Sequence, residues 1–135
     1  MSETDPPRRP HQGASPTQLR LIRLSLLLPV VVFGGIVSVM VQRDPPRAPE
    51  LARPLLMVNL AYLVGAMAGI LYFQRRHAAE PDRQRRTTLN VVAWALGEST
   101  ALFGAVHYLL VGSPVPYLVG LCMLVASFVL VPVRD

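Results

Sequence analysis

The chain of 135 residues contains no lysine and one cysteine, Cys122. A single cysteine cannot form a disulfide within the chain, and a thiolate metal site would lack companion ligands. We therefore expect Cys122 to be a small buried apolar residue and expect no metal. Without lysine, all thirteen basic side chains are arginines. These arginines flank apolar segments and do not form a patch of their own, so we expect no nucleic-acid partner.

Charge is also nearly absent from the second half of the chain. Residues 87–133 form a stretch of 47 in which Glu98 is the only acidic or basic side chain, apart from the neutral His107. A transmembrane helix needs about 20 predominantly apolar residues, and 52% of the chain is apolar. Backbone groups in lipid must be satisfied within the segment, so these runs predict helices. Four runs qualify: Leu24–Gln42, Pro54–Gln74, Thr87–Val111 and Tyr117–Val133.

The sequence thus predicts an all-α integral membrane protein, a four-helix bundle formed by residues 18–135. We expect its helices near residues 20–42, 54–75, 87–111 and 115–133. The first run is longer than the ~7–15 residues of a signal-peptide core and no small-residue cleavage site follows it, so we expect it to remain. Residues 1–17 contain four prolines and almost nothing to bury, which is typical of a disordered tail.

The arginines predict the orientation of the chain. Ten of them precede the first helix, lie in the second connection or follow the last helix, whereas three lie in the first connection and none in the third. Cytoplasmic loops carry the excess of positive charge in membrane proteins. We therefore expect a multi-pass protein of the inner (plasma) membrane with both termini in the cytoplasm, and the lipid bilayer as its first partner.

Small residues recur at every fourth position of two consecutive runs. Such faces let transmembrane helices approach closely, because packing drives their association in lipid. The second and third runs are joined by a short connection, so we expect them to form a tightly packed antiparallel hairpin. The residues at this contact would be Gly65 and Gly69 on one helix and Ala93, Gly97, Ala101 and Ala105 on the other.

Glu98 is the candidate functional residue. A carboxylate at the middle of a bilayer costs ~2.5–3.5 kcal/mol on insertion scales, and such residues usually serve a function. Three interpretations remain open from the sequence. Glu98 could be neutral and hydrogen-bonded across the hairpin, it could bind a proton or a cation reversibly, or it could contact a charge or ligand from a partner.

The neighbours of Glu98 in the predicted hairpin define the candidate site. Tyr62 falls at the same depth on the second helix, and its hydroxyl is the best available donor. Ser99 and Thr100 follow Glu98 directly, although such hydroxyls often bond the carbonyl one turn earlier. Asn59 lies one turn further out and is the next candidate.

The run ALGESTALFG, Ala95–Gly104, resembles the outer helix of rotor-ring subunits from rotary ATP synthases. In that family a glutamate within the membrane is followed by small residues and by an aromatic residue five positions on. Sodium-binding rings have serine and threonine after the glutamate, as here. The resemblance covers about residues 65–110 and implies ion or proton binding by Glu98 in an oligomeric ring. The sequence departs from the family at Phe103, where sodium-type rings have tyrosine, and in having only two glycines on the facing helix.

We interpret the chain as a small inner-membrane protein in which Glu98 reversibly binds a proton or cation, alone, as a homo-oligomer or within a larger membrane complex. The alternative is a non-catalytic scaffold or accessory subunit in which Glu98 has a structural or partner-contacting role. An enzyme is not expected, since one carboxylate without a nucleophile or cofactor motif makes no active site. No cofactor is expected.

A proton relay from Glu98 to His107 is not expected either, because a separation of nine residues places His107 on the opposite side of the helix. We expect His107 to pack by hydrogen bonding.

Overall fold

The computed structural model describes residues 15–44 and 46–132, and within these ranges it consists of helices without a strand. The prediction of an all-α fold with four long helices is confirmed. Of the predicted tail, residues 1–17, the first fourteen lie outside the described residues. Residue 133, the predicted end of the last helix, also lies outside them. The elements are α1 (Pro16–Arg43), the single-turn 3₁₀ helix η1 (Pro49–Leu51), α2 (Ala52–Ala79), α3 (Arg83–Val111) and α4 (Val115–Leu130).

Polar caps extend two helices beyond their apolar runs. Ser15 and Gln18 form a capping box in which each side chain accepts a hydrogen bond from the backbone N–H of the other, so α1 begins at Pro16 instead of residue 20. The Oδ1 atom of Asp82 accepts a hydrogen bond from the Gln84 N–H and starts α3 four residues before the predicted residue 87. Both side chains satisfy N–H groups that lack partners within the first turn of a helix.

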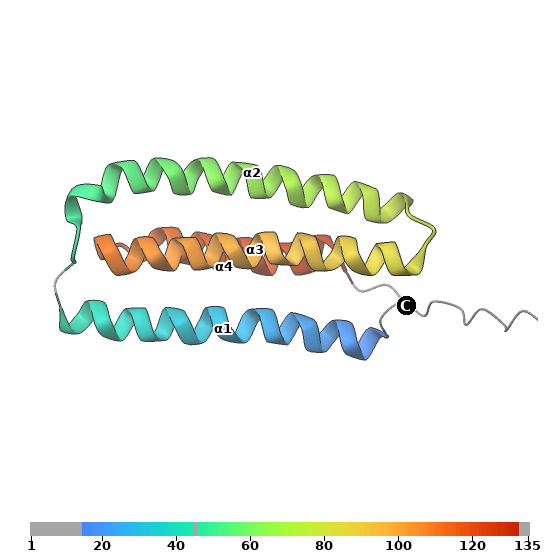
Figure 1. The fold of residues 1–135 in the computed structure, drawn as a ribbon, viewed down its shortest axis with the longest axis horizontal. Helices are drawn as coiled ribbons and strands as arrows, with labels where there is room; N and C mark the ends of the chain where they lie inside the picture. The colour runs from blue at the N-terminus through green and yellow to red at the C-terminus, as the bar shows by residue number, and fades with distance from the viewer. Residues whose placement is uncertain (1–14, 45, 133–135) are drawn as a thin grey trace, which may run out of the picture.

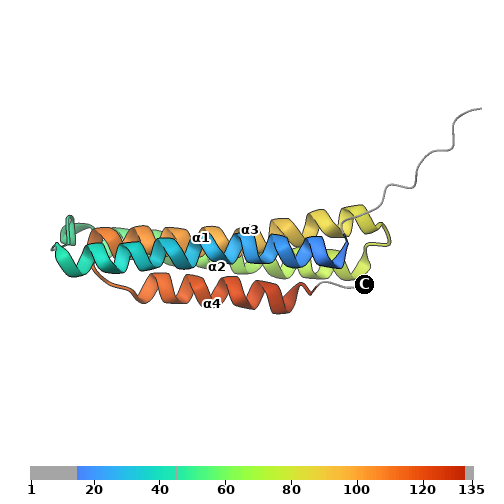
Figure 2. The ribbon, with the colours of Figure 1, turned by 90° about the horizontal axis from the view of Figure 1, so that it is seen from below.

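The helix α3 is the centre of the bundle. In Figure 1 α1 and α2 run on opposite sides of it, and Figure 2 shows α4 covering a third side. The start of α1, the α2–α3 turn and the carboxyl end of α4 lie at the same end of the molecule, which we call the N-terminal end of the bundle (Figure 1). The helices α1, α2 and α3 are long and apolar enough to cross a membrane.

The helix α4 is shorter than predicted. Its 16 residues span about 24 Å at ~1.5 Å per residue, less than the ~30 Å hydrocarbon core of a bilayer. It begins inset from the end of α3, as Figure 2 shows, and the Pro116 backbone lies against Gly104. Among the described residues three of the four predicted spans are thus helices long and apolar enough to cross a membrane, and the fourth is a shorter apolar helix.

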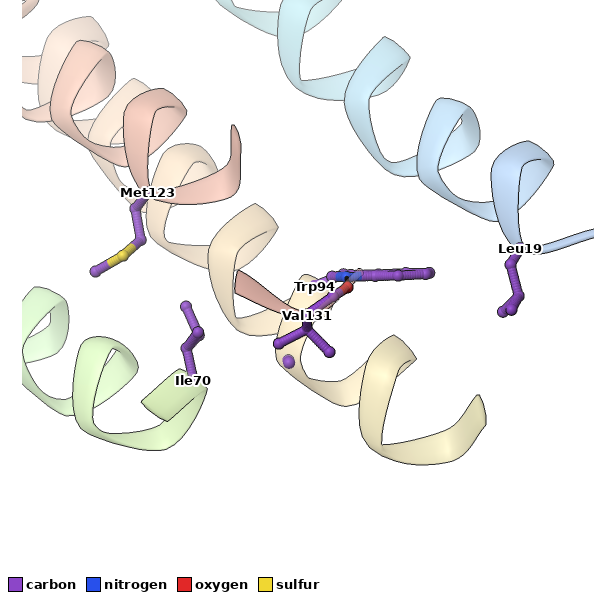
Figure 3. Packing of buried hydrophobic residues seen from close by; sticks show 6 residues of the cluster. Leu19, Ile70, Trp94, Met123 and Val131 are labelled. Atoms are coloured by element: carbon purple, nitrogen blue, oxygen red, sulfur yellow. Dashed lines mark hydrogen bonds between the residues drawn. The ribbon is translucent and has the colours of Figure 1, made fainter. Parts of the chain in front are cut away.

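The main core cluster lies between all four helices. It contains Leu19 from α1, Ile70 from α2, Trp94 from α3 and Met123 from α4, which Figure 3 shows together with Val131. Trp94 is the largest fully buried side chain. Because the four helices each contribute to one cluster, the bundle shares a single main core around α3.

The helices α2 and α3 form the predicted antiparallel hairpin (Figure 1), but the closest helix contact joins α3 to α4, so the predicted tight packing through Gly65 and Gly69 is corrected. A Cβ at Gly97 would lie 2.8 Å from the Cα of Leu124, and one at Gly120 would lie 2.5 Å from the Cα of Ala101. A Cβ at Gly65 would meet no atom within 4 Å. At Gly69 it would meet only the tip of Leu96, at 2.8 Å. Spacing by four correctly marks a smooth face on α3, but that face meets α4.

Candidate functional site

Glu98 lies on the side of α3 that faces α1. Trp94, one turn earlier, lies beneath the guanidinium of Arg23 from α1, and a step of four residues turns the helix by only about 40° from its starting direction. The next residue, Ser99, instead contacts Tyr62 of α2. Glu98 is therefore directed away from α2, and its side chain is part-buried. The predicted buried position within the α2–α3 hairpin was wrong.

The carboxylate of Glu98 has no hydrogen bond or ion pair within residues 15–44 and 46–132. An ion pair on the surface joins Arg85 to Asp82 at 4.0 Å. No group of three or more histidine, cysteine or acidic side chains in these ranges could hold a metal ion. The carboxyl group of Glu98 thus makes no hydrogen bond or ion pair that joins α3 to another described helix.

The Tyr62 hydroxyl donates to a different residue from the one predicted. It donates a 2.8 Å hydrogen bond to the Ser99 Oγ, which in turn donates to the Leu96 carbonyl at 2.9 Å. Tyr62 was expected to donate to Glu98, but two consecutive residues of a helix point about 100° apart. Only one of them can face α2, and in this structure it is Ser99.

Thr100 is buried and its hydroxyl also turns back onto its own helix. It donates to the Leu96 carbonyl at 2.8 Å, which is a common arrangement for hydroxyl side chains within a helix. Neither this hydroxyl nor that of Ser99 is directed to Glu98. Among the described residues the predicted hydrogen bonds from these two hydroxyl groups to Glu98 are therefore absent.

Asn59 contacts His107 and not Glu98. Its Nδ2 atom donates to the Leu55 carbonyl at 2.9 Å and lies 3.3 Å from the His107 Nδ1. His107 is buried, with 2% of its surface exposed. The expectation that His107 is a hydrogen-bonding packing residue is confirmed, and this contact joins α2 to α3 near their far ends. Cys122, in contrast, is exposed and not buried as predicted.

A cluster that the sequence did not predict lies one turn from Glu98. Arg23 donates from its Nη2 atom to the carbonyls of Phe128 and Val131 at 2.8 and 3.0 Å. Trp94 donates from Nε1 to the same Val131 carbonyl at 3.1 Å. The last carbonyls of a helix have no partner within it, so these two side chains satisfy the carboxyl end of α4.

This cluster explains how α4 can end inside the bundle. Carbonyls at a helix terminus carry partial negative charge, and a cation placed there is favourable. The Arg23 guanidinium also lies over two aromatic rings, 4.6 Å from the centre of Trp94 and 5.4 Å from that of Phe128. In the sequence Arg23 is only one of ten arginines in the orientation count, so no signal there singles it out.

No family model, curated protein or solved structure matches the chain. The likeness to rotor-ring subunits therefore stays a prediction.

Proposed function

We propose that this chain is an integral membrane protein that binds a proton reversibly at Glu98. Three of its helices are long and apolar enough to cross a membrane, and Glu98 lies at the middle of one of them. The observation that carries the proposal is that its carboxylate has no partner within the described ranges. An ionisable side chain on such a helix is costly unless it is paired or neutral, so protonation is the simplest means of lowering that cost.

A proton is favoured over a metal cation as the bound species. A cation such as Na⁺ or Ca²⁺ requires several oxygen ligands, whereas a proton requires one carboxylate. The Ser99 and Thr100 hydroxyls both donate to the Leu96 carbonyl and the Tyr62 hydroxyl donates to Ser99, so none of these three hydroxyl groups is hydrogen-bonded to Glu98. Among the described residues no other oxygen group is hydrogen-bonded to the Glu98 carboxylate, which supports a proton as the bound species.

We further propose that the N-terminal end of the bundle lies in the cytoplasm and that the membrane is the inner (plasma) membrane. Arg75, Arg76, Arg83 and Arg85 are exposed at this end, around the α2–α3 turn. Positive side chains are retained on the cytoplasmic side. The start of α1 and the carboxyl end of α4 lie at the same end (Figure 1), so the arrangement of the helices supports the orientation that the arginine count predicts.

The alternative is a scaffold or accessory subunit in which Glu98 meets a positive charge on a partner. The partial exposure of Glu98 favours this alternative over a carboxyl group sealed within the bundle. A partner's cation would keep Glu98 ionised, whereas proton binding requires a neutral form that is populated within the working range of pH. The two functions therefore differ in a measurable property of one side chain.

A hydrophobic carbodiimide distinguishes these functions, because it reacts with protonated carboxyl groups in apolar surroundings. Purified protein is treated across pH, and modified peptides are mapped by mass spectrometry. Proton binding predicts modification of Glu98 that declines as the pH rises and is lost in Glu98→Gln. Glu50 is an exposed acid in η1, and Glu50→Gln serves as the matched control that leaves modification of Glu98 unchanged. Absence of any modification of Glu98 between pH 5 and 9 would contradict the proposal.

A further inference from the structure

An apolar groove runs between α2 and α4, two helices that both pack on α3. Its volume is about 590 Å³, within the ~300–1,000 Å³ typical of small-molecule sites. Among the residues that the structure describes, no charged side chain lines it. The lining consists of Leu63, Val64, Met67, Ala68 and Leu71 from α2 and of Val119, Cys122, Met123 and Ala126 from α4.

A smaller cavity of about 120 Å³ adjoins this groove, because Leu63 and Val119 line both. Its lining includes an amide and a hydroxyl residue, Asn59 and Thr100, which the lining of the groove does not. The two spaces together offer a long apolar part with hydrogen-bonding groups at one end only. A molecule that filled both would be an amphiphile with a small polar head and an apolar body.

The hydrogen bonds already made in the cavity define the chemistry of that head. The amide nitrogen of Asn59 is bonded to the Leu55 carbonyl and to His107 Nδ1, whereas its Oδ1 accepts no hydrogen bond among the described residues. The Thr100 hydroxyl gives its proton to the Leu96 carbonyl and keeps its lone pairs. Both groups are therefore acceptors. A complementary head must donate a hydrogen bond, as a hydroxyl group does.

The position of the cavity also argues for an uncharged head. Asn59 lies seven residues inside the start of α2 at Ala52, which is about 10 Å along the helix. Within residues 15–44 and 46–132, no arginine or acidic residue lines either space. A phosphate or carboxylate head would lose its hydration there without gaining a cation, and that loss is expensive.

We propose that the α2–α4 groove binds a lipid alcohol, an uncharged hydrocarbon body with one hydroxyl group that donates to Asn59 Oδ1 and Thr100 Oγ1. This site lies between α2 and α4, whereas Glu98 faces α1, so it goes beyond proton binding and does not depend on it. The apolar body fills the space between Met67 and Cys122, and the hydroxyl group selects among ligands of equal chain length.

The probe is a twelve-carbon alcohol with a photoreactive diazirine in its tail, applied to the full chain in phospholipid nanodiscs. Cross-links are mapped by mass spectrometry and competed with unlabelled 1-dodecanol, dodecane or dodecyl phosphate. Cross-links are expected in residues 63–71 and 119–126, and 1-dodecanol should compete about three- to tenfold better than the other two, the worth of one hydrogen bond. Equal competition by dodecane or by dodecyl phosphate, or labelling spread evenly over α1, would overturn the proposal.

Two variants separate recognition of the head from filling of the groove. Asn59→Leu keeps the size of the side chain but removes the acceptor, so the advantage of 1-dodecanol over dodecane should shrink about three- to tenfold. Ala68→Phe fills the groove and should abolish labelling. Ala95→Phe places the same ring on an exposed position of α3 outside the groove and should leave labelling unchanged. Undiminished labelling of a folded Ala68→Phe protein would also overturn the proposal.

Discussion

The guanidinium of Arg23 lies 4.6 Å from the centre of the Trp94 ring, and both side chains donate to the carbonyl of Val131. Three helices thus meet at one backbone oxygen, since Arg23 belongs to α1, Trp94 to α3 and Val131 follows α4. Hydrogen bonds from charged donors are stronger than neutral ones, and a guanidinium over an aromatic face adds to them. This cluster closes the end of α4, the shortest of the four α-helices among the described residues.

Arg23→Gln should destabilise the protein by about 2–3 kcal/mol, because it removes two charge-assisted hydrogen bonds and the contact with the Trp94 ring. Arg23→Lys keeps the charge but lacks the planar fork of donors, so its loss should be intermediate. The measurement is the free energy of unfolding of the purified protein in detergent. Arg20 lies one turn earlier and is exposed, and Arg20→Gln should change stability by no more than about 0.5 kcal/mol. Equal losses at both positions would mean that the α4 carbonyls need no arginine.

Gly120→Ala should be far more damaging than Gly65→Ala. A Cβ at Gly120 would lie 2.5 Å from the Cα of Ala101, which is backbone and cannot rotate away, whereas a Cβ at Gly65 meets nothing within 4 Å. Overpacking of this kind costs about 1–3 kcal/mol, while alanine for glycine in an open helix position is neutral or stabilising by up to ~1 kcal/mol. Unfolding free energies of the two variants provide the comparison. A greater loss at Gly65 would show that the α2–α3 hairpin is the tight pair after all.

Tyr62→Phe should cost about 0.6–1 kcal/mol, because it removes the hydrogen bond to Ser99, and it should leave carbodiimide modification of Glu98 unchanged. Tyr72 is an exposed tyrosine on the same helix, and Tyr72→Phe is the matched control with no expected effect on stability. Stability is measured by thermal unfolding and modification by mass spectrometry. If Tyr62→Phe altered the pH range in which Glu98 reacts, the hydroxyl group would act on the carboxylate and the assigned direction of Glu98 would be incorrect.

Topology reporters should place the α2–α3 turn on the same side of the membrane as the start of the chain. A reporter inserted at Pro81, within this turn, is expected to report the cytoplasm, and one at Arg47, between α1 and α2, the opposite side. The reason is the greater number of arginines around the turn. Reporters at Pro81 and Arg47 on the same side would contradict the passage of α2 through the membrane.

The number and position of the helices could be predicted from the sequence, because uncharged apolar runs bounded by arginines leave few alternatives. Their exact starts depended on single polar residues. Ser15 and Asp82 begin α1 and α3 through hydrogen bonds, and these lie outside the apolar runs. The length of α4 could not be predicted, since its end is set by Arg23 and Trp94 from other helices.

The candidate site could be predicted only in part. Glu98 stands out because it is the single charge in a long apolar stretch, and that signal needs no tertiary structure. Predicting the neighbours of Glu98 would have required knowing how α3 is rotated about its own axis. Spacing by four shows that Gly97 and Ala101 share a face, but it does not say whether that face meets α2 or α4. The structure turns it to α4, and this rotation places Ser99 instead of Glu98 beside Tyr62.

The most direct test of reversible protonation is an infrared pH titration of the protein in lipid, recorded for wild type and for Glu98→Gln. The C=O stretch of a protonated carboxyl group is absent from a carboxylate, so the difference between the two titrations isolates Glu98. Glu50→Gln, which removes an exposed acid, serves as the control for titration of the other carboxyl groups. We expect a band in wild type that is lost as the pH rises from 5 to 9 and is missing from Glu98→Gln at every pH. A difference spectrum without a band that changes over this range would contradict proton binding at Glu98.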